Sequence, residues 1–336
     1  MTTDTIRWGI IGCGNVTEVK SGPALQKARG SQLVAVMRRN GDLARDYAQR
    51  HGVPKWYNEA DALIHDPEVD AVYVATPPSS HLEYTLAVAQ AGKPVYVEKP
   101  MARTYAECQT MIAACEQAGV PLFVAYYRRR LPRFLKVKAW LDAGAIGEVR
   151  SVNTVLYRPP SPEDCSDTKP WRLDPEIAGC GYFCDLGSHM LDLLQYLLGP
   201  IETAQGYATN QGGCYEAEDA VSATWLHENG IHGAGTWHFT TQHRVDRTEI
   251  VGTTGIIRYA TFDDEPVTLE RQGETKSVRI ENPPHIQQPL IQSVVDTLLG
   301  HGECPSTGHT AALTNRVIDM ILKNPHPLFQ KVRNHS

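Results

Sequence analysis

The chain has 336 residues, of which 42% are hydrophobic and 21% are charged, a composition typical of a folded soluble protein. This length is large for a single hydrophobic core and predicts two domains. The net charge of −6 gives no sign of the basic surface that binds DNA, RNA or an anionic membrane. No apolar run approaches the roughly 18 residues of a membrane span. Neither nucleic acid nor a membrane is therefore an expected partner.

The first third of the chain alternates short β-branched runs with helical patterns. Strands are expected at 6–11, 33–36, 71–75, 95–97 and 121–125, and helices at 43–50, 82–91 and 105–117. Gly92 follows one of these helices, as expected for a residue just beyond a helix end. A repeated strand–helix–strand rhythm predicts right-handed crossovers and a doubly wound α/β sheet, the Rossmann arrangement.

The pattern changes after residue 125. A helix at 134–143 and a strand at 149–157 precede a loop at 158–178, whose length indicates a functional or disordered segment. A helix at 182–198 is followed by strands near 201–209, 219–227, 231–240, 245–251 and 255–262, and then by helices at 289–299 and 309–322. Consecutive strands predict an antiparallel or mixed sheet. We therefore expect a dinucleotide-binding domain over residues 1–125 and a substrate and oligomerisation domain over 126–336.

The eight cysteines are scattered through the chain, with no CxxC pair. This distribution predicts reduced thiols, mostly buried as small hydrophobic side chains. The first residues carry no basic segment of the kind that opens a secretory signal peptide. Together these features predict a cytoplasmic protein.

A glycine turn, Gly9-Ile10-Ile11-Gly12-Cys13-Gly14-Asn15-Val16, follows the first strand and opens a helix. This is the context that a dinucleotide fingerprint needs. Gly12 permits the tight turn, and Gly14 lets backbone amides approach a pyrophosphate at the helix N-terminus, next to Asn15 and Val16. Thr17 stands where a third glycine or alanine is usual, so a glycine-rich turn without a ligand is the alternative interpretation.

The second strand ends in Val36-Met37-Arg38-Arg39-Asn40, where an NAD site normally has an acid that binds the ribose 2′-hydroxyl. No acid is present, and a guanidinium is well suited to clamp a 2′-phosphate. We therefore favour NADP over NAD, with Arg38 ahead of Arg39 because it comes first after the strand. A solvated basic pair at a strand end is the alternative.

Glu98-Lys99-Pro100 follows the strand at 95–97, which places Lys99 at a carboxyl strand end, where open α/β sheets bind ligands. A lysine there can donate a hydrogen bond to a substrate oxygen or help to shuttle its proton. Pro100 also allows a cis peptide bond. A surface Glu–Lys pair is the alternative.

Asp185 and His189 stand four residues apart in a glycine-rich segment. On a helix these positions share a face, so both side chains could reach one substrate. An imidazole can exchange a proton with an alcohol near neutral pH. A buried structural histidine is one alternative, and a zinc site of Cys180, Cys184 and His189 is another, although that spacing matches no usual zinc pattern.

Taken together, the motifs resemble those of the glucose-fructose oxidoreductase, inositol dehydrogenase and MocA family (GFO/IDH/MocA). The resemblance rests on the glycine turn, Ala75-Thr76-Pro77-Pro78 with His81, the run Ala91-Gly92-Lys93-Pro94-Val95-Tyr96-Val97-Glu98-Lys99-Pro100, and the Asp185/His189 segment, in that order. It implies a Rossmann domain followed by an α/β domain on a large, mostly antiparallel open sheet. The exposed face of that sheet commonly mediates assembly, so a homodimer or homotetramer is expected, and the helix at 309–322 is expected to pack back on the Rossmann domain.

The resemblance also implies roles for individual residues. His189 would accept the proton of a substrate hydroxyl, Lys99 would lower the pKa of that hydroxyl, and Asp185 would orient the substrate. The cofactor would be lined by Thr76, Pro77, His81, Glu98, Lys99, Trp171 and Arg172, and the substrate by Lys99, Tyr127, Arg128, Asp185 and His189. Cys180 departs from the family's usual glycine and is expected to change packing more than chemistry.

The leading hypothesis is reversible hydride transfer between NADP or NAD and a secondary hydroxyl, or its carbonyl, on a sugar, inositol or related polyol. A glycosidase of the same fold that oxidises its sugar only transiently is one alternative, and it would show no net change in cofactor. A non-catalytic dinucleotide-binding sensor is another. The set of Lys99, Asp185 and His189 argues against the sensor, which has no need of acid–base groups.

Overall fold

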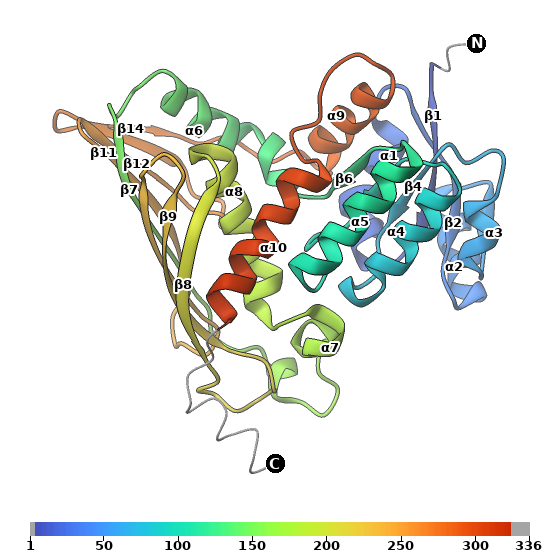
Figure 1. Cartoon of the computed structure of the whole chain (residues 1–336), viewed down its shortest axis with the longest axis horizontal. Helices are drawn as coiled ribbons and strands as arrows, with labels where there is room; N and C mark the ends of the chain where they lie inside the picture. Colours follow the sequence, from blue (N-terminus) through green and yellow to red (C-terminus); the bar gives the residue numbers. More distant parts are fainter. Residues whose placement is uncertain (1–3, 324–336) are drawn as a thin grey trace. The chain divides into compact units, whose positions relative to one another are not determined.

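The computed structural model describes residues 4–323, which form two compact units (Figure 1). The first unit runs to Leu131 and also contains residues 283–312. The second comprises residues 132–282 and, within the described chain, 313–323. The boundary expected at 125/126 therefore misses a segment that returns to the first unit late in the chain.

The first unit is built on a six-stranded sheet in the order β3-β2-β1-β4-β5-β6, with every neighbouring pair parallel. The strands are β1 (Ile6–Ile11), β2 (Ser31–Met37), β3 (Lys55–Tyr57), β4 (Ala71–Val74), β5 (Val95–Val97) and β6 (Leu122–Val124). Strands β4, β5 and β6 are buried at every residue, as required of a parallel sheet covered on both faces. The predicted doubly wound sheet is confirmed.

The helices of the first unit are α1 (Gly22–Lys27), α2 (Gly41–His51), α3 (Ala60–Ile64), α4 (His81–Gln90), α5 (Tyr105–Ala118) and α9 (Gln288–Leu298). Two of them, α2 and α5, begin at side-chain caps and end at a glycine in the left-handed region. The side chain of Thr104 accepts a hydrogen bond from the amide of Glu107 at the start of α5, and Gly119 ends that helix in the left-handed region. The core includes Ala311 and Ala312 from the start of α10 (Gly308–Leu322).

The second unit is built on an eight-stranded sheet in the order β14-β13-β12-β11-β7-β10-β9-β8. Only the β7–β10 pair is parallel, so the mostly antiparallel sheet is confirmed. Its strands are β7 (Val149–Tyr157), β8 (Ile201–Thr209), β9 (Ala220–His227), β10 (His232–His238), β11 (Val245–Gly252), β12 (Gly255–Tyr259), β13 (Val267–Arg271) and β14 (Glu274–Val278).

Helices α6 (Pro132–Asp142) and α8 (Ser188–Leu198) lie along one face of this sheet, and the short α7 (Pro175–Ala178) belongs to the loop before α8 (Figure 1). Residues of β10 alternate between buried and more exposed positions, as expected when the two faces differ. Trp237 of β10 is fully buried, and its indole nitrogen donates to the sulfur of Met190 in α8 at 3.2 Å. The side chains of α8 therefore form the core of this unit together with the buried face of the sheet.

The cysteines do not all behave as the sequence predicts. Cys165 is bonded to Cys214 and Cys180 to Cys184, so the expectation of reduced thiols is wrong for these four. A search for CxxC pairs cannot find them, because folding brings together residues as much as 49 positions apart in the chain. The remaining cysteines are free and buried, as predicted: Cys13, Cys108, Cys115 and Cys304. No helix within residues 4–323 combines the length and apolarity needed to cross a bilayer.

Candidate active site

The glycine turn has the backbone geometry of a dinucleotide cradle. Gly12 has a φ of +88°, and a Cβ placed there would lie 2.7 Å from Cγ2 of Thr76. The amide of Gly12 donates to the carbonyl of Met37 at 2.8 Å, which fastens the turn to the end of β2. At Gly14 an added Cβ would meet nothing closer than 3.8 Å, so its open side leaves room for a ligand. These residues fit the pyrophosphate of a dinucleotide, held by amides at the start of the following helix.

The departure at Thr17 is accommodated by a change in the helix. Residues Thr17–Ser21 form a π-helical turn before α1. Thr17 is fully buried, and its hydroxyl donates to the carbonyl of Gly14 at 2.8 Å. The close approach usually made by the third glycine is made instead by Gly22, where a Cβ would lie 2.2 Å from the hydroxyl oxygen of Tyr47. The turn therefore keeps its shape without a glycine at position 17.

The two arginines after β2 are both exposed and face different neighbours. Burial raises the pKa of Cys13, within the glycine turn, to about 11, and the positive charge of Arg38 is the largest effect opposing that rise. The charge of Arg39 instead opposes the raised pKa of Tyr84 in α4. Arg38 also directly follows Met37, whose carbonyl accepts from the amides of Gly12 and Cys13, so its backbone adjoins the glycine turn.

Lys99 follows a buried carboxylate with three hydrogen bonds. Oε1 of Glu98 accepts from the hydroxyl of Tyr73 at 2.5 Å and from Nε2 of Gln287 at 2.6 Å. Its Oε2 accepts from the backbone amide of Lys99 at 3.0 Å. The hydroxyl of Tyr96 in turn donates to Oε1 of Gln287 at 3.1 Å. This network holds the backbone from which Lys99 extends.

Gln287 is the member of this network that the sequence does not reveal. It is fully buried and lies immediately before α9, far from Glu98 in the chain. Glu98 itself is only 6% exposed, because its carboxylate faces the protein interior. A polar residue at the start of an apolar helix is the only sequence signal, and it equally suggests an ordinary helix cap.

His81 joins two turns at the same edge of the sheet. It is fully buried, and its Nε2 lies 2.7 Å from the carbonyl oxygen of Thr76, while its Nδ1 lies 3.1 Å from that of Pro100. Burial lowers the pKa of His81. Pro77 lies in the first of these turns, and the Lys99–Pro100 peptide in the second is cis. His81 thus supports the turns around the cofactor position, with its ring nitrogens directed at backbone.

Tyr127 and Arg128 begin a 3-10 helix directly after β6. Both are buried, and the guanidinium of Arg128 lies 5.1 Å from the centre of the Tyr127 ring. The next residue, Arg129, was not singled out from the sequence. It donates to the carbonyl of Pro305 at 2.6 Å and to the hydroxyl of Thr310 at 2.8 Å, so it fastens the returning segment within the first unit.

The second unit contains Asp185 and His189. The helix predicted at 182–198 begins with a π-helical turn, Phe183–Gly187, before α8. Such turns are frequent at functional sites because the extra residue redirects side chains. His189 is 4% exposed, and its ring centre lies 6.0 Å from that of Phe262.

Arg172 is an ion-pair partner of Asp185. Its Nε lies 3.2 Å from Oδ2 of Asp185, and its guanidinium lies 4.4 Å from the centre of the Trp171 ring. One of the two loop residues, Arg172, therefore contacts one residue of the expected acid–base set, and Trp171 packs against that arginine.

The zinc alternative is not supported by the cysteine geometry. Cys180 and Cys184 are bonded to each other, so their sulfurs are not thiolate ligands. Among residues 4–323, no three His, Cys, Asp or Glu side chains gather in an arrangement that could hold a metal ion.

Comparisons with known proteins agree with this architecture. Residues 6–126 match a family model described as an oxidoreductase family with an NAD-binding Rossmann fold, and residues 134–258 match the GFO/IDH/MocA C-terminal domain. Oxidoreductase P35 of Formosa agariphila is 41% identical to this chain, over 94% of the chain and 98% of that protein. The chain belongs to the GFO/IDH/MocA family.

Other GFO/IDH/MocA proteins extend the comparison. The 1,5-anhydro-D-fructose reductase of Ensifer adhaerens is 29% identical over 90% of this chain and 91% of its own length. The crystal structure of the aldose-aldose oxidoreductase of Caulobacter crescentus superposes with a TM-score of 0.83 and 25% identity, covering 99% of this chain and 98% of that one. The protein is therefore an oxidoreductase with the two-unit fold of the family.

Proposed function

We propose that this oxidoreductase transfers a hydride between a nicotinamide dinucleotide and a secondary hydroxyl, or its carbonyl, on a sugar, inositol or related polyol. The observation that carries the proposal is the presence, in one chain, of a glycine turn shaped for a dinucleotide and of Lys99, Asp185 and His189. The names of the reductase from Ensifer adhaerens and the oxidoreductase from Caulobacter crescentus, both sugar enzymes, support this substrate class.

The proposed chemistry divides between the cofactor and the side chains. The nicotinamide, when bound, accepts or supplies the hydride. His189 takes the proton of the substrate hydroxyl, since imidazole exchanges protons near neutral pH. Lys99 donates a hydrogen bond to the same oxygen and stabilises the negative charge that develops there. Asp185 orients the substrate.

NADP is the proposed cofactor. The support is Arg38, whose backbone adjoins the glycine turn at the end of β2, where an NAD site would normally have an acid. A guanidinium forms paired, charge-assisted hydrogen bonds with a phosphate. Arg38 would hold the 2′-phosphate, and Thr76, Pro77 and Glu98 would line the rest of the cofactor, together with Trp171 and Arg172.

A homodimer or homotetramer formed through the open face of the second sheet is also proposed. Two shallow grooves cross that face over β7, β8, β9 and β10, and both are lined by Asn153, Gln205, Thr224 and Ala234. Tyr207 is 68% exposed there. Light scattering should report a multiple of the chain mass, and Tyr207→Arg should shift it toward the monomer.

The sequence predicts the cytoplasm, but the two disulfides favour an oxidising compartment, which is the location proposed here. Cytosolic reductants keep thiols reduced, whereas structural disulfides persist in oxidising compartments. Alkylation in freshly lysed native cells, followed by mass spectrometry, counts the free thiols. Eight alkylated cysteines would support the cytoplasm, and four would exclude a reducing compartment.

The function is tested with a panel of sugars and polyols, using NAD and NADP in turn and following the absorbance of the reduced nicotinamide. Lys99→Ala and His189→Ala should each lower kcat/KM by about 10²–10⁴-fold. The exposed residues Lys20 and His301, changed to alanine, serve as matched controls. Full turnover in the Lys99 and His189 variants would refute the assigned roles. Cleavage of a glycoside without net change in the cofactor would identify a glycosidase instead.

A further inference from the structure

The disulfide between Cys180 and Cys184 ends one residue before Asp185. It closes the turn that leads into the π-helical segment, with the two Cα atoms 5.5 Å apart. Inside this turn, the amide of Gly181 donates to Oε1 of the buried Glu218 at 3.0 Å. The backbone leading to Asp185 is thus held by a covalent bond and by a buried carboxylate.

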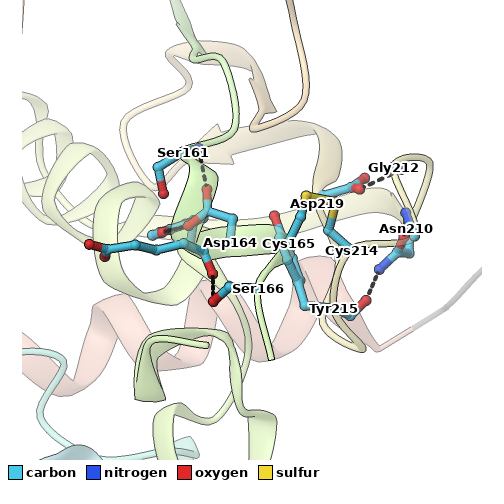
Figure 2. The surroundings of a disulfide bond; sticks show 12 residues. Ser161, Asp164, Cys165, Ser166, Asn210, Gly212, Cys214, Tyr215 and Asp219 are labelled. Carbon is cyan, nitrogen blue, oxygen red and sulfur yellow. Dashed lines mark hydrogen bonds between the residues drawn. A yellow bond between two sulfur atoms is a disulfide. The ribbon is translucent and has the colours of Figure 1, made fainter. Parts of the chain in front are cut away.

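The second disulfide fastens the loop that carries Arg172. Cys165, in this loop, is bonded to Cys214 in the connection between β8 and β9 (Figure 2). That connection is itself internally bonded, because the carboxylate of Asp219 accepts from the amide of Gly212 at 2.7 Å. The disulfide therefore attaches a long loop to an ordered turn.

Tyr182 links the two disulfides through their neighbouring residues. Its hydroxyl donates to Oδ1 of Asp164 at 2.5 Å, directly before Cys165. Its ring meets that of Tyr215, directly after Cys214, edge-on with ring centres 6.2 Å apart. The guanidinium of Arg158 lies 4.2 Å from the centre of the Tyr182 ring. Because Tyr182 stands between Cys180 and Cys184 in the chain, all four cysteines belong to one cluster.

The charges within this cluster are compensated. Burial disfavours ionisation of Asp164, but hydrogen bonds from Tyr182 and from the amide of Ser161 outweigh it and lower the pKa of that carboxyl. The guanidinium of Arg158 lies 3.1 Å from the same carboxylate. Burial and the Asp164 carboxylate raise the pKa of Tyr182 to about 12, so its hydroxyl remains a donor at neutral pH.

Both partners of the Arg172–Asp185 ion pair lie on segments held by this cluster. Arg172 follows Cys165 in the fastened loop, and Asp185 follows Cys184. A loop of this length would otherwise sample many conformations, and a cross-link removes that freedom. Catalysis is sensitive to such freedom, since a displacement of about 1 Å can reduce a rate about 10²-fold.

We propose that the disulfides Cys165–Cys214 and Cys180–Cys184, joined through Tyr182, position Asp185 and Arg172 for the reaction, so that the oxidised protein is the active form. This inference rests on the proposed function for its kinetic readout. Dithiothreitol donates two electrons and two protons to each disulfide, yields two cysteine thiols and is itself oxidised to its cyclic disulfide. Reduction should lower kcat with the sugar or polyol substrate about 10–100-fold while circular dichroism shows the fold retained.

Variants separate positioning from folding. Cys180→Ser/Cys184→Ser and Cys165→Ser/Cys214→Ser should each lower kcat and respond less to dithiothreitol, because each retains one disulfide, and the variant without any of these four cysteines should not respond. The buried free thiol variant Cys115→Ala should keep the wild-type kcat and response. Reoxidation should restore full activity in the wild type and in Cys115→Ala. Tyr182→Phe should lower kcat with little change in the KM for the cofactor. Unchanged kcat on reduction would overturn the proposal, and so would loss of activity that follows global unfolding.

Two measurements do not depend on turnover. Titration of the denatured, unreduced protein with a thiol reagent should find four reactive thiols, and eight would overturn the inference. Trypsin should cleave after Arg172 faster once the disulfides are reduced. Equal cleavage rates would also overturn it. If these two results hold while no substrate turns over, the proposed function fails, but the inference that the two disulfides hold the loop and the turn is retained.

Discussion

Replacing Gln287 with alanine tests the network beneath Lys99. The change removes the donor that lies 2.6 Å from Oε1 of Glu98 and the acceptor that lies 3.1 Å from the hydroxyl of Tyr96. A hydrogen bond to a charged group contributes about 1.5–3 kcal/mol, and a buried polar group left without a partner costs about 1–3 kcal/mol. We expect the free energy of unfolding to fall by about 4 kcal/mol, because both groups are buried.

The catalytic consequence follows from the second oxygen of the same carboxylate. Glu98 accepts from the amide of Lys99, so a displaced carboxylate displaces the backbone that carries the lysine. We expect kcat to fall by about 10–100-fold, with a smaller change in the KM of the sugar or polyol. Urea denaturation gives the free energy, and steady-state kinetics give kcat and KM.

The neighbouring Gln288 provides the matched control, because its side chain is only partly buried. Gln288→Ala should change stability by less than about 0.5 kcal/mol. In Gln287→Glu, two carboxylates would share one buried position, which raises their pKa values above those of the unfolded chain. That variant should therefore lose stability as the pH rises from 5 to 8. Wild-type kcat in both Gln287 variants would refute the positioning role of Glu98.

Three further predictions concern the first unit. Arg38→Ala should raise the Kd of NADP at least tenfold more than the Kd of NAD, as measured by fluorescence titration. Arg39→Ala is the control. Equal effects of Arg38→Ala on both Kd values would exclude Arg38 as the residue that binds the 2′-phosphate. Gly12→Ala should abolish dinucleotide binding, because a Cβ there meets Thr76 at 2.7 Å, and unimpaired binding would show that the turn holds no cofactor. The paired guanidinium of Arg50 lowers the pKa of Glu18 to about 2. Glu18→Gln should therefore lower the free energy of unfolding above pH 4.5, and the difference between variant and wild type should shrink as the pH falls toward 2. Urea denaturation across that range checks this, and a difference independent of pH would contradict it.

Much of the fold could be predicted because its signals are local. Strand β5 and helix α5 follow from a short apolar run and a helical pattern, and Gly119 marks where the helix ends. The hairpin of β13 and β14 was missed because both strands are only five residues long and β14 is almost wholly exposed, with no apolar alternation. Its turn at Gln272 and Gly273, both with positive φ, replaces the usual Asn-Gly or Asp-Gly signal.

The candidate site was predictable only where its chemistry follows a motif. Gly12 and Lys99 lie at strand ends, where the fold itself concentrates function. The contacts of Gln287 and the Cys165–Cys214 disulfide depend on segments that meet only after folding, so the sequence alone does not predict them. The Cys180–Cys184 disulfide is local, but its spacing is not that of a CxxC pair. The π-helical turn before α8 was likewise hidden, since its residues satisfy an ordinary helical pattern.

The return of residues 283–312 to the first unit makes residues 132–282 of the second unit an insertion within the Rossmann unit, and residues 313–323 complete the second unit. A fragment that stops at Leu131 would lack α9 and Gln287, and would therefore expose apolar surface and leave Glu98 without one of its donors. The excised N-terminal fragment is thus not an independent cofactor-binding module. By contrast, residues 132–282 leave and re-enter the first unit at two points, so recombination that exchanges the second unit must replace both this segment and residues 313–323, while the residues of the glycine turn are inherited unchanged.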